Sequence, residues 1–568
     1  MRALPESGGA PGTCALWFER PAPRCKVARM TVEEPRRNRA LVWALVAAFG
    51  VRWMIAARAP IIEVDGAYWA GLAAALERGD FRHGLSTAWP PLYPALVAVL
   101  LRIARVAGLA PGPAIAEAGA RAVSVLAGTL LLIPLHALAR RLLSPRAATI
   151  AVLLAAFHPR LLQYSAAVLS EATFVLLLVG ALALLVSSEE SEGAAATSRE
   201  AASGALFGLA YLARPEGLLL AAAAWVVGLF RGRSAATPGA GGSFVARLRP
   251  AFVVAVLVVA LPWLMFLHGT LGRWTLGEKG EYNFWRAFAS EYAADFPAPA
   301  GLAARVNESP EIAPPPSTDR VHVPEFALRR PGVVLARCAG NLATILVSTL
   351  PVTLYWALVP FALLALLRAW PPGAWPVAVA LGAMPLLYAP FSVDRRFFVP
   401  AVPLLLIACA AGIERGESWL ARRAGSAARA RRGVNAALAV IVALAVGYAF
   451  TKGSGFDQAP EHRRAGEWLG RNPEAGTAGG ERPIVMSRKP WVAFYSGGLI
   501  AALPDTAPDS LVALARARGA FLVADERSAR SDRPRLAPLL DASGPPAGLT
   551  AIHREPGPPS LVLYRPRP

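Results

Sequence analysis

Residues 170–187, SEATFVLLLVGALALLVS, decide the fold class of this chain. The run is mostly apolar and carries one charge, Glu171, near its start. A helix needs about 20 mostly apolar residues to cross a bilayer, with a range of roughly 17–25. Over the whole chain of 568 residues, hydrophobic residues make up 55% and charged residues 17%, whereas soluble proteins carry about 25% charged residues. The composition therefore predicts a membrane protein.

Similar apolar runs follow one another along the chain and predict about eleven membrane crossings. The runs are 40–57, 121–139, 147–165, 170–187, 201–213, 215–230, 250–268, 341–367, 374–391, 397–413 and 434–450. Arg214-Pro215 separates two short runs, because proline ends a helix; a single long helix over 201–230 is the alternative. Leu92 to Leu101 is too short to cross and is followed by two arginines, which predicts an amphipathic helix at the membrane surface.

Basic residues set the predicted orientation. The net charge of +20 would suggest nucleic-acid binding in a soluble protein, but many arginines stand in short loops between apolar runs, which excludes that class. Arginine-rich short loops face the cytoplasm. These loops contain Arg140, Arg141, Arg146, Arg231, Arg233, Arg247, Arg249, Arg368, Arg415, Arg422, Arg423, Arg429, Arg431 and Arg432. Loops 58–120 and 269–336 then face outward, and counting 92–101 as a crossing would reverse every span from 121 onward.

The two ends of the chain differ from its middle. Residues 1–39 predict a disordered cytoplasmic tail, and they lack the apolar stretch of a secretory signal. Met30 is an alternative start, which would make 1–29 an extension that is not translated. Residues 40–451 form the predicted transmembrane module. The tail, 452–568, alternates helical stretches (Glu461 to Leu469, Ser510 to Ala517) with apolar strands (Ile484 to Met486, Phe521 to Ala524, Ser560 to Tyr564).

This alternation predicts a small extracytoplasmic α/β domain at the C-terminus. The fold class is therefore a polytopic all-α membrane protein with an α/β tail. The four cysteines form no CxxC pair, so a disulfide framework, structural zinc and thiol redox chemistry are not predicted. The chain has no Walker loop or GxGxxG turn, so a nucleotide is not a predicted energy source.

Three acidic residues are candidates for chemistry. Glu63 and Asp65 follow the first apolar run directly, where burial at the membrane surface is expected to raise the pKa of a carboxyl group and make it a better general base. The alternative is that both are simply solvated at the exit of a span. Glu171 is an ionisable residue at the start of a span, which favours a functional role; capping of the helix N-terminus is the alternative.

Basic residues at the predicted outer boundary form a second group of candidates. Arg214 and Glu216 stand on either side of Pro215; arginine suits phosphate binding, and an internal ion pair is the alternative. Arg395 and Arg396 run against the inside bias of arginine, which indicates binding of an anionic headgroup or pyrophosphate; snorkelling of the side chains at the interface is the alternative. His158 is a lone histidine at a helix break, a place where histidine is more often structural than a ligand.

Seven motifs in order carry a resemblance to a known superfamily. They are Glu63-Val64-Asp65 with Tyr68, Trp89-Pro90-Pro91-Leu92-Tyr93-Pro94, Arg121, Leu169-Ser170-Glu171, Leu212-Ala213-Arg214-Pro215-Glu216-Gly217, Arg395-Arg396-Phe397-Phe398-Val399-Pro400-Ala401-Val402-Pro403, and Ala493-Phe494-Tyr495-Ser496-Gly497. The chain resembles the GT-C superfamily of polyprenyl-phosphate-sugar glycosyltransferases. It looks most like the family 39 branch, with protein O-mannosyltransferases and the lipid A aminoarabinose transferase.

The resemblance implies transfer of one sugar, with inversion, from a polyprenyl-phosphate donor to a hydroxyl of a lipid, polysaccharide or protein, outside the cytoplasm at the plasma membrane. It implies Asp65 as the base, with Glu63 and Glu171 as further catalytic candidates. The substrate-binding candidates are Tyr68, Arg121, His158, Arg214, Glu216, Arg395 and Arg396. The family commonly has Glu after this Asp, where this chain has Gly66. No metal ligand or cofactor is assigned, and a divalent metal is left as an alternative.

Two other classes of function remain as rivals. A transporter or flippase of lipid-linked sugars predicts related halves with broken helices and carboxylates at mid-membrane, and the sequence has no internal repeat. A non-catalytic envelope assembly protein predicts that Asp65 and Arg395 are replaceable without loss of function.

Overall fold

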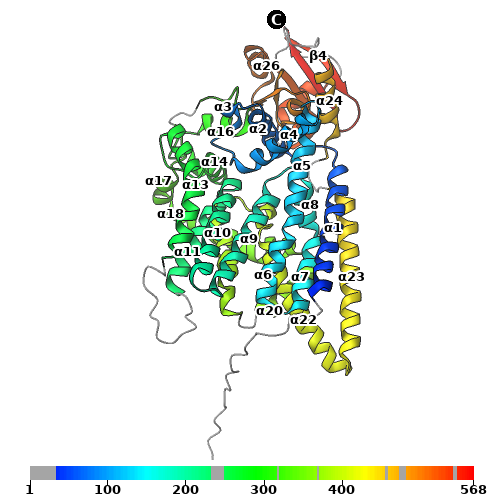
Figure 1. Cartoon of the computed structure of the whole chain (residues 1–568). Helices are drawn as coiled ribbons and strands as arrows, with labels where there is room; N and C mark the ends of the chain where they lie inside the picture. Colours follow the sequence, from blue (N-terminus) through cyan, green and yellow to red (C-terminus); the bar gives the residue numbers. More distant parts are fainter. Residues whose placement is uncertain are drawn as a thin grey trace, which may run out of the picture. The chain divides into compact units, whose positions relative to one another are not determined.

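The computed structural model describes residues 34–231, 248–315, 319–366, 370–453, 458–472, 482–531, 533–541 and 547–567. Contacts within the chain define two units, Met1–Trp43 and Ala44–Pro568. The second unit holds nearly all described elements and is described by itself (Figure 1). Helix α1 (Glu34–Ala57) begins inside the segment 1–39 that the sequence predicts to be disordered. The alternative start at Met30 lies outside the described residues.

Helices make up most of the chain before the tail. In order, they are α2 (Val64–Glu77), α3 (Phe81–Gly84), α4 (Leu92–Val106), α5 (Pro113–Leu130), α6 (Leu132–Leu142), α7 (Pro145–Phe157), α8 (Pro159–Ala166), α9 (Glu171–Glu189), α10 (Gly193–Ala213), α11 (Glu216–Arg231), α13 (Pro250–Leu271), α14 (Glu278–Ala287), α15 (Ala289–Tyr292), α16 (Ala300–Asn307), α17 (Val323–Arg329), α18 (Pro331–Thr344), η1 (Ile345–Thr349), α19 (Leu350–Leu354), η2 (Trp356–Leu358), α20 (Val359–Leu366), η3 (Pro372–Ala374), α21 (Trp375–Tyr388), η4 (Arg395–Phe398), α22 (Ala401–Ala424) and α23 (Ala427–Lys452).

Several of these helices are long and apolar enough to cross a membrane. Five qualify among the described residues: Pro113–Leu142, Glu171–Glu189, Pro250–Leu271, Pro331–Leu354 and Ala427–Lys452. Shorter apolar helices are Leu41–Ala57, Pro145–Phe157, Trp356–Ala365 and Trp375–Tyr388. Every apolar run of the sequence is largely helical. The structure therefore agrees with a multi-pass helical membrane protein, while the number of eleven crossings stays a prediction.

The break at Arg214-Pro215 divides residues 193–231 into two helices, so a single long helix is wrong. Arg214 is extended (φ −155°, ψ 138°), because the residue before a proline is pushed out of the helical region. Helix α11 then turns back against α10, and a Cβ at Gly217 would lie 2.4 Å from the backbone nitrogen of Tyr211. Glycine is required there, and the tight turn holds Arg214 and Glu216 at one end of both helices.

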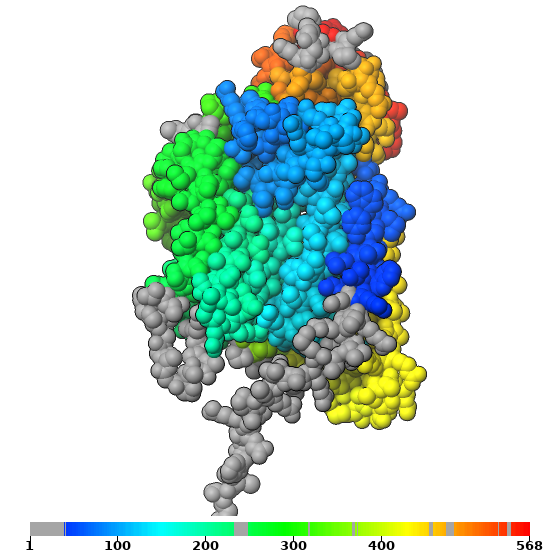
Figure 2. All heavy atoms as spheres, viewed as in Figure 1, coloured from blue at the N-terminus to red at the C-terminus, as the bar shows by residue number. Residues whose placement is uncertain are grey.

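The short apolar run after residue 91 forms α4, which is not among the helices that qualify as spans within the described residues. It packs against α2 and α5 and is buried through Tyr93, whose hydroxyl donates to the carbonyl of Ala120 at 2.9 Å. In the space-filling view, the blue residues of α2 to α4 lie between the sheet and the cyan and green helices (Figure 2). The amphipathic helix predicted over 92–101 is therefore present as a separate element.

The tail contains a five-stranded sheet in the order β2-β1-β3-β5-β4. The strands are β1 (Ile484–Ser487), β2 (Leu499–Ala502), β3 (Phe521–Asp525), β4 (Leu549–Glu555) and β5 (Leu561–Pro566). Strand β1 is parallel to β2 and β3, with Ile484 opposite Leu499 and Val485 opposite Phe521, while β5 is antiparallel to β3 and β4. The three strands and two helices predicted for the tail coincide with strands and helices of the structure, except that β5 begins at Leu561 and not at Ser560.

Helices cover both faces of this sheet, because successive strand residues point to opposite sides. Helices α24 (Pro460–Arg471) and α25 (Trp491–Tyr495) pack with Val485 and Phe521 on one face. Helices α26 (Pro508–Ala517) and η7 (Pro534–Leu540) pack with Met486 on the other, and α27 is Glu526–Ser531. The contacts do not separate the tail from the helices as a unit of its own.

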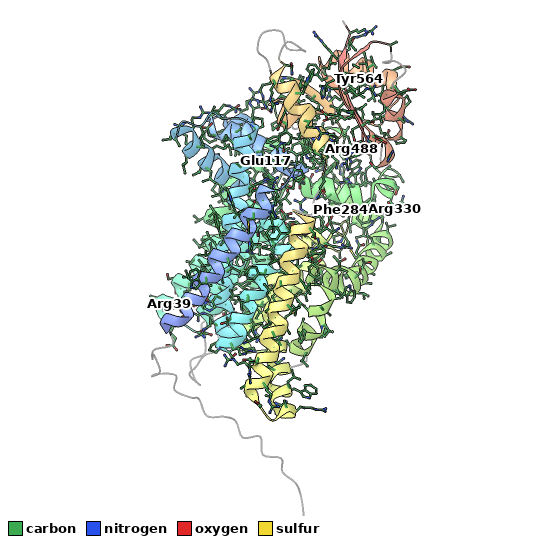
Figure 3. The ribbon with its side chains drawn as sticks, turned by 90° about the vertical axis from the view of Figure 1, so that its right-hand side faces the viewer. Arg39, Glu117, Phe284, Arg330, Arg488 and Tyr564 are labelled. Carbon is green, nitrogen blue, oxygen red and sulfur yellow. The ribbon has the colours of Figure 1, made fainter. Side chains whose placement is uncertain are left out.

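Two aromatic residues of α25 hold the backbone just before α2. The Tyr495 hydroxyl accepts a hydrogen bond from the nitrogen of Ile62 at 2.8 Å, and the Trp491 indole donates to the Ile62 carbonyl at 2.7 Å. Tyr495 also donates to Glu117 on α5 at 2.9 Å. Figure 3 shows Glu117 close to the tail. The tail therefore fixes the position at which α2 begins.

Candidate active site

Charged side chains from five separate stretches meet where α2 and α9 begin. Together they are called the charged cluster: Asp65 on α2, Glu171 on α9, Arg214 and Glu216 at the α10–α11 break, Lys279 on α14 and Arg396 on η4. Helices α2 and α14 lie at the end of the helices nearest the sheet (Figure 1). The chain folds so that acids and bases from distant positions share one place.

Asp65 is paired with two cations. Its Oδ1 accepts from the Lys279 ammonium at 3.3 Å, and its Oδ2 lies 2.6 Å from Nη1 of Arg396. The three side chains are partly exposed, with accessible fractions of 17% for Asp65, 28% for Lys279 and 25% for Arg396. Asp65 stands in the first turn of α2, where the helix N-terminus also favours a negative charge. A carboxylate and two cations therefore face one accessible space.

Glu171 lies beneath these groups and is fully buried. One of its carboxylate oxygens accepts from both Arg396 and Arg214, the latter at 2.8 Å. Arg214 also donates to Glu216 at 3.1 Å, and Glu216 accepts from the hydroxyl of Tyr388 at 2.5 Å. Glu171 therefore sets the positions of two guanidinium groups and has no exposed surface of its own.

The charges around Asp65 reverse the expected direction of its pKa. Burial alone would raise the pKa of Asp65, but the charges of Lys279 and Arg396 outweigh burial and hold the pKa well below its usual range. Burial lowers the pKa of the Lys279 ammonium to about 8, although Asp65 favours the charged form. The expectation that burial raises the pKa is thus wrong for Asp65. For Glu63 it is right, because burial raises the pKa of that carboxyl.

Glu63 and Arg121 belong to a second group of charges, here called the closed network. Arg121 donates to Glu117 at 2.8 Å and to the carbonyls of Ile61 and Ala166, and it lies 3.7 Å from Glu63. Glu63 accepts from the nitrogen of Val168 at 2.6 Å. The side chains of Glu63, Arg121 and Glu117 are 3%, 7% and 8% exposed. Glu63, two residues before Asp65, therefore stabilises the backbone of its own chain.

The remaining candidates lie apart from these pairs. His158 is buried, with Nε2 at 3.3 Å from the carbonyl of Leu354 and its ring edge against Tyr355. Arg395 is exposed beside Arg396. Tyr68 stacks on Trp89 with ring centroids 5.3 Å apart and donates to the carbonyl of Asn307.

Lys279 is the residue of the cluster that the sequence motifs miss. Its ammonium lies 3.2 Å from the centre of the Trp89 ring, a cation–π contact that adds to its pairing with Asp65. One signal was available, because the chain has four lysines among its 58 basic residues. A lysine in a chain that uses arginine almost everywhere marks a position where a compact point charge is preferred.

Metal ligation finds little support in the side chains. No group of three or more His, Cys, Asp or Glu residues that could hold a metal occurs in the part of the chain that the structure describes. Both carboxylate oxygens of Asp65 are paired with cations. The charged cluster contains three acids (Asp65, Glu171 and Glu216) and three bases (Arg214, Lys279 and Arg396), so its formal charges balance in this structure.

Part of the chain matches a known family, and its fold is similar to solved structures. Residues 89–266 match the dolichyl-phosphate-mannose-protein mannosyltransferase family, and no curated protein matches the chain by sequence. The fold is similar to ArnT from Cupriavidus metallidurans bound to undecaprenyl phosphate, with 15% identity, a TM-score of 0.55, and coverage of 92% of this chain and 97% of that chain.

The fold is also similar to the oligosaccharyltransferase AglB from Archaeoglobus fulgidus in complex with an inhibitory peptide and a dolichol-phosphate. Here the identity is 14% and the TM-score 0.58, covering 87% of this chain and 70% of that chain. The resemblance to the GT-C superfamily of glycosyltransferases is therefore confirmed, by the family match over residues 89–266 and by the fold over most of the chain.

Proposed function

We propose that the chain is an integral-membrane glycosyltransferase of the plasma membrane that moves a sugar from a polyprenyl-phosphate-linked donor to an acceptor hydroxyl, with inversion, on the extracytoplasmic face. The observation that carries this proposal is Asp65 between Lys279 and Arg396. One accessible space there offers a proton acceptor and two phosphate-binding cations, on a fold that similar proteins use with undecaprenyl phosphate and dolichol-phosphate.

The proposed reaction forms one bond to the anomeric carbon of the sugar and breaks another. The acceptor oxygen attacks the anomeric carbon from the face opposite the phosphate, the bond from that carbon to the phosphate oxygen breaks, and Asp65 takes the hydroxyl proton. The phosphate leaves with one more negative charge than it had in the donor. Lys279 and Arg396 stabilise that charge as it develops, so no nucleotide is needed at this step.

The resting pairs of Asp65 suggest an order of binding. In the structure its oxygens are held by the same two cations that a donor phosphate would engage. A bound phosphate competes with Asp65 for those cations, and the loss of these pairs raises the basicity of the carboxylate. The donor therefore binds first, and its arrival prepares the base for the acceptor.

Glu171 and Glu216 act as positioning residues in this proposal. The buried Glu171 oxygen holds Arg396 and Arg214 together, and Glu216 ties Arg214 to Tyr388. A buried acid with two arginine partners fixes the positions of both guanidinium groups. Arg395, exposed beside them, is placed to meet the lipid headgroup region.

The sidedness rests on the arginines at the opposite end of the helices. The turn between α22 and α23 lies far from the sheet (Figure 1) and carries Arg422, Arg423, Arg429, Arg431 and Arg432. Short loops with such a bias stay in the cytoplasm. The charged cluster, near the sheet end, then faces outward.

The experiment compares glycolipids and glycoproteins by mass spectrometry in cells carrying the intact chain, Asp65→Asn or no chain. We expect Asp65→Asn to lower product formation by about 100- to 10,000-fold, because it removes the base. Asp505→Asn, an exposed aspartate on the tail, is the matched control and should keep the full profile. A full profile in Asp65→Asn cells at equal protein level would refute the proposal and leave an assembly role.

A further inference from the structure

A cavity of about 340 Å³ lies next to the charged cluster and contains none of its side chains. Its walls come from α2, the α4–α5 connection, residues 305–311 and residues 482–500 of the tail. Pockets for small ligands measure about 300–1,000 Å³, so this one suits a small guest.

One aromatic side chain separates the cavity from the proposed base. Trp89 lines the cavity, and the Lys279 ammonium that pairs with Asp65 sits 3.2 Å from the centre of the Trp89 ring. Tyr68, one helical turn after Asp65 on α2, also lines the cavity and stacks on Trp89. A guest in the cavity is therefore a neighbour of the residues that would act on it.

The wall formed by α2 is flat. Ala67, Ala70, Gly71 and Ala74 all line the cavity, and their spacing places them on one face of the helix. Small residues on this face leave room beside the rings of Tyr68, Trp89 and Phe494. A flat space with aromatic rings at its edge accepts a planar or ring-shaped guest.

Two buried acids in the walls have an oxygen without a hydrogen bond. Oε1 of Glu77 has no hydrogen-bond partner among the described residues and lies 3.8 Å from Arg102, while the other oxygen of this carboxylate accepts from Arg105. Oε2 of Glu308 is likewise unpartnered within the described part of the chain, while its Oε1 accepts from Ala502 and Arg518. Both side chains are 3% exposed. Both residues line the cavity, so its wall carries two carboxylates with hydrogen-bonding capacity that the described residues do not use up.

We propose that this cavity binds the acceptor, and that the acceptor is a saccharide of one or two rings; this rests on the proposed function. Sugar rings offer several closely spaced hydroxyl groups to a wall that contains Glu77 and Glu308, and their C–H faces pack on aromatic rings. A lipid tail would place hydrocarbon against these two carboxylates, which is unfavourable. The hydroxyl nearest Tyr68 and Trp89 is the one that meets Asp65 once the donor has displaced Lys279.

Filling the cavity tests this assignment without disturbing the charged cluster. A Cβ at Gly71 would meet no atom within 4 Å, so Gly71→Phe places a ring in the open space of the cavity. Ala74→Phe, on the same face of α2, is the second filling variant. Gly340→Phe on α18 is the matched control, because a Cβ there also meets nothing within 4 Å and the site is outside the cavity.

The measurement is saturation-transfer NMR on the detergent-solubilised full chain. The probes are methyl glycosides of glucose, galactose, mannose and N-acetylglucosamine, with an N-acetylated, C-amidated serine as the peptide hydroxyl probe. We expect signal on at least one glycoside with the intact chain and with Gly340→Phe, and at least a fivefold loss in both filling variants. Signal on the serine probe alone, on no probe, or unchanged in the filling variants overturns the assignment.

Asp65→Asn separates this inference from the proposed function. It should abolish sugar transfer while leaving the glycoside signal in the cavity unchanged. Glycoside binding together with a normal product profile in Asp65→Asn cells would end the proposed mechanism and leave the saccharide site standing. Loss of product in Asp65→Asn with no glycoside signal in the intact chain would do the reverse.

Discussion

The charged cluster and the closed network use the same residue types, and they begin two residues apart at Glu63 and Asp65. In the closed network, an arginine with 7% exposure lies between two buried acids and donates to backbone carbonyls. In the charged cluster, Asp65, Lys279 and Arg396 keep between 17% and 28% of their surface accessible. The difference teaches that a charged pair becomes a candidate for chemistry when its partners can still be exchanged for a ligand.

The largest effect is expected where the closed network is broken. Arg121→Met removes the cation between Glu63 and Glu117 and leaves only Arg463, 3.7 Å from Glu117; removing one partner of a buried pair costs about 3–5 kcal/mol. The free energy of unfolding in detergent, followed by SDS titration, should fall by that amount, while the rate per folded molecule changes little. Arg82→Met, at an exposed arginine on α3, is the control. Equal stability of the Arg121 variant would show that the network is not structural.

The second-largest effect is expected in the charged cluster. Arg396→Met removes a cation that faces the leaving phosphate, and loss of one such donor costs about 100- to 1,000-fold in rate. The unfolding free energy should change less than in the Arg121 variant, because Glu171 keeps Arg214 as a partner. The measurement is product formation per folded molecule. A rate within threefold of the intact chain would remove Arg396 from the phosphate site.

The smallest effect is a pH dependence that belongs to Lys279. With its pKa at about 8, the ammonium loses its proton as the pH rises from 7 to 9, so a phosphate loses one cation. The second ionisation of a phosphate monoester, near about pH 6, is complete before this range. We expect the affinity for undecaprenyl phosphate to fall about tenfold between pH 7 and 9. Lys279→Arg should bind equally at both pH values; a parallel decline in this variant would assign the titration to another group.

The fold could be predicted from the lengths of the apolar runs and from the residues that end helices. Every apolar run forms helix, Pro215 ends α10 in the expected place, and the alternation in the tail forms strands, because each of these depends on neighbours in sequence. The site depends on contacts between distant positions. Glu63 and Asp65 look equivalent in the sequence, but one meets the nitrogen of Val168 and the other meets Lys279 and Arg396.

Lys279 and Glu117 illustrate why the rest of the site could not be predicted. Neither stands in a motif, and each gains its role from a partner far away, Asp65 in one case and Tyr495 in the other. The direction of the Asp65 pKa depended on those partners too. The burial of Asp65 could be expected from its position after a span, whereas its pairing with two cations could not.

The hydrogen bonds that join Tyr495 and Trp491 to the backbone of Ile62 have a consequence for the synthesis and folding of the protein. The backbone that leads into the proposed proton acceptor is fastened by side chains 433 and 429 positions later. While the ribosome is still making the tail, the helices can already be in the bilayer, and the start of α2 is then held by Arg121 and Val168 but not yet by Tyr495 and Trp491. The complete set of contacts at the start of α2 therefore forms only when synthesis of the chain is nearly finished.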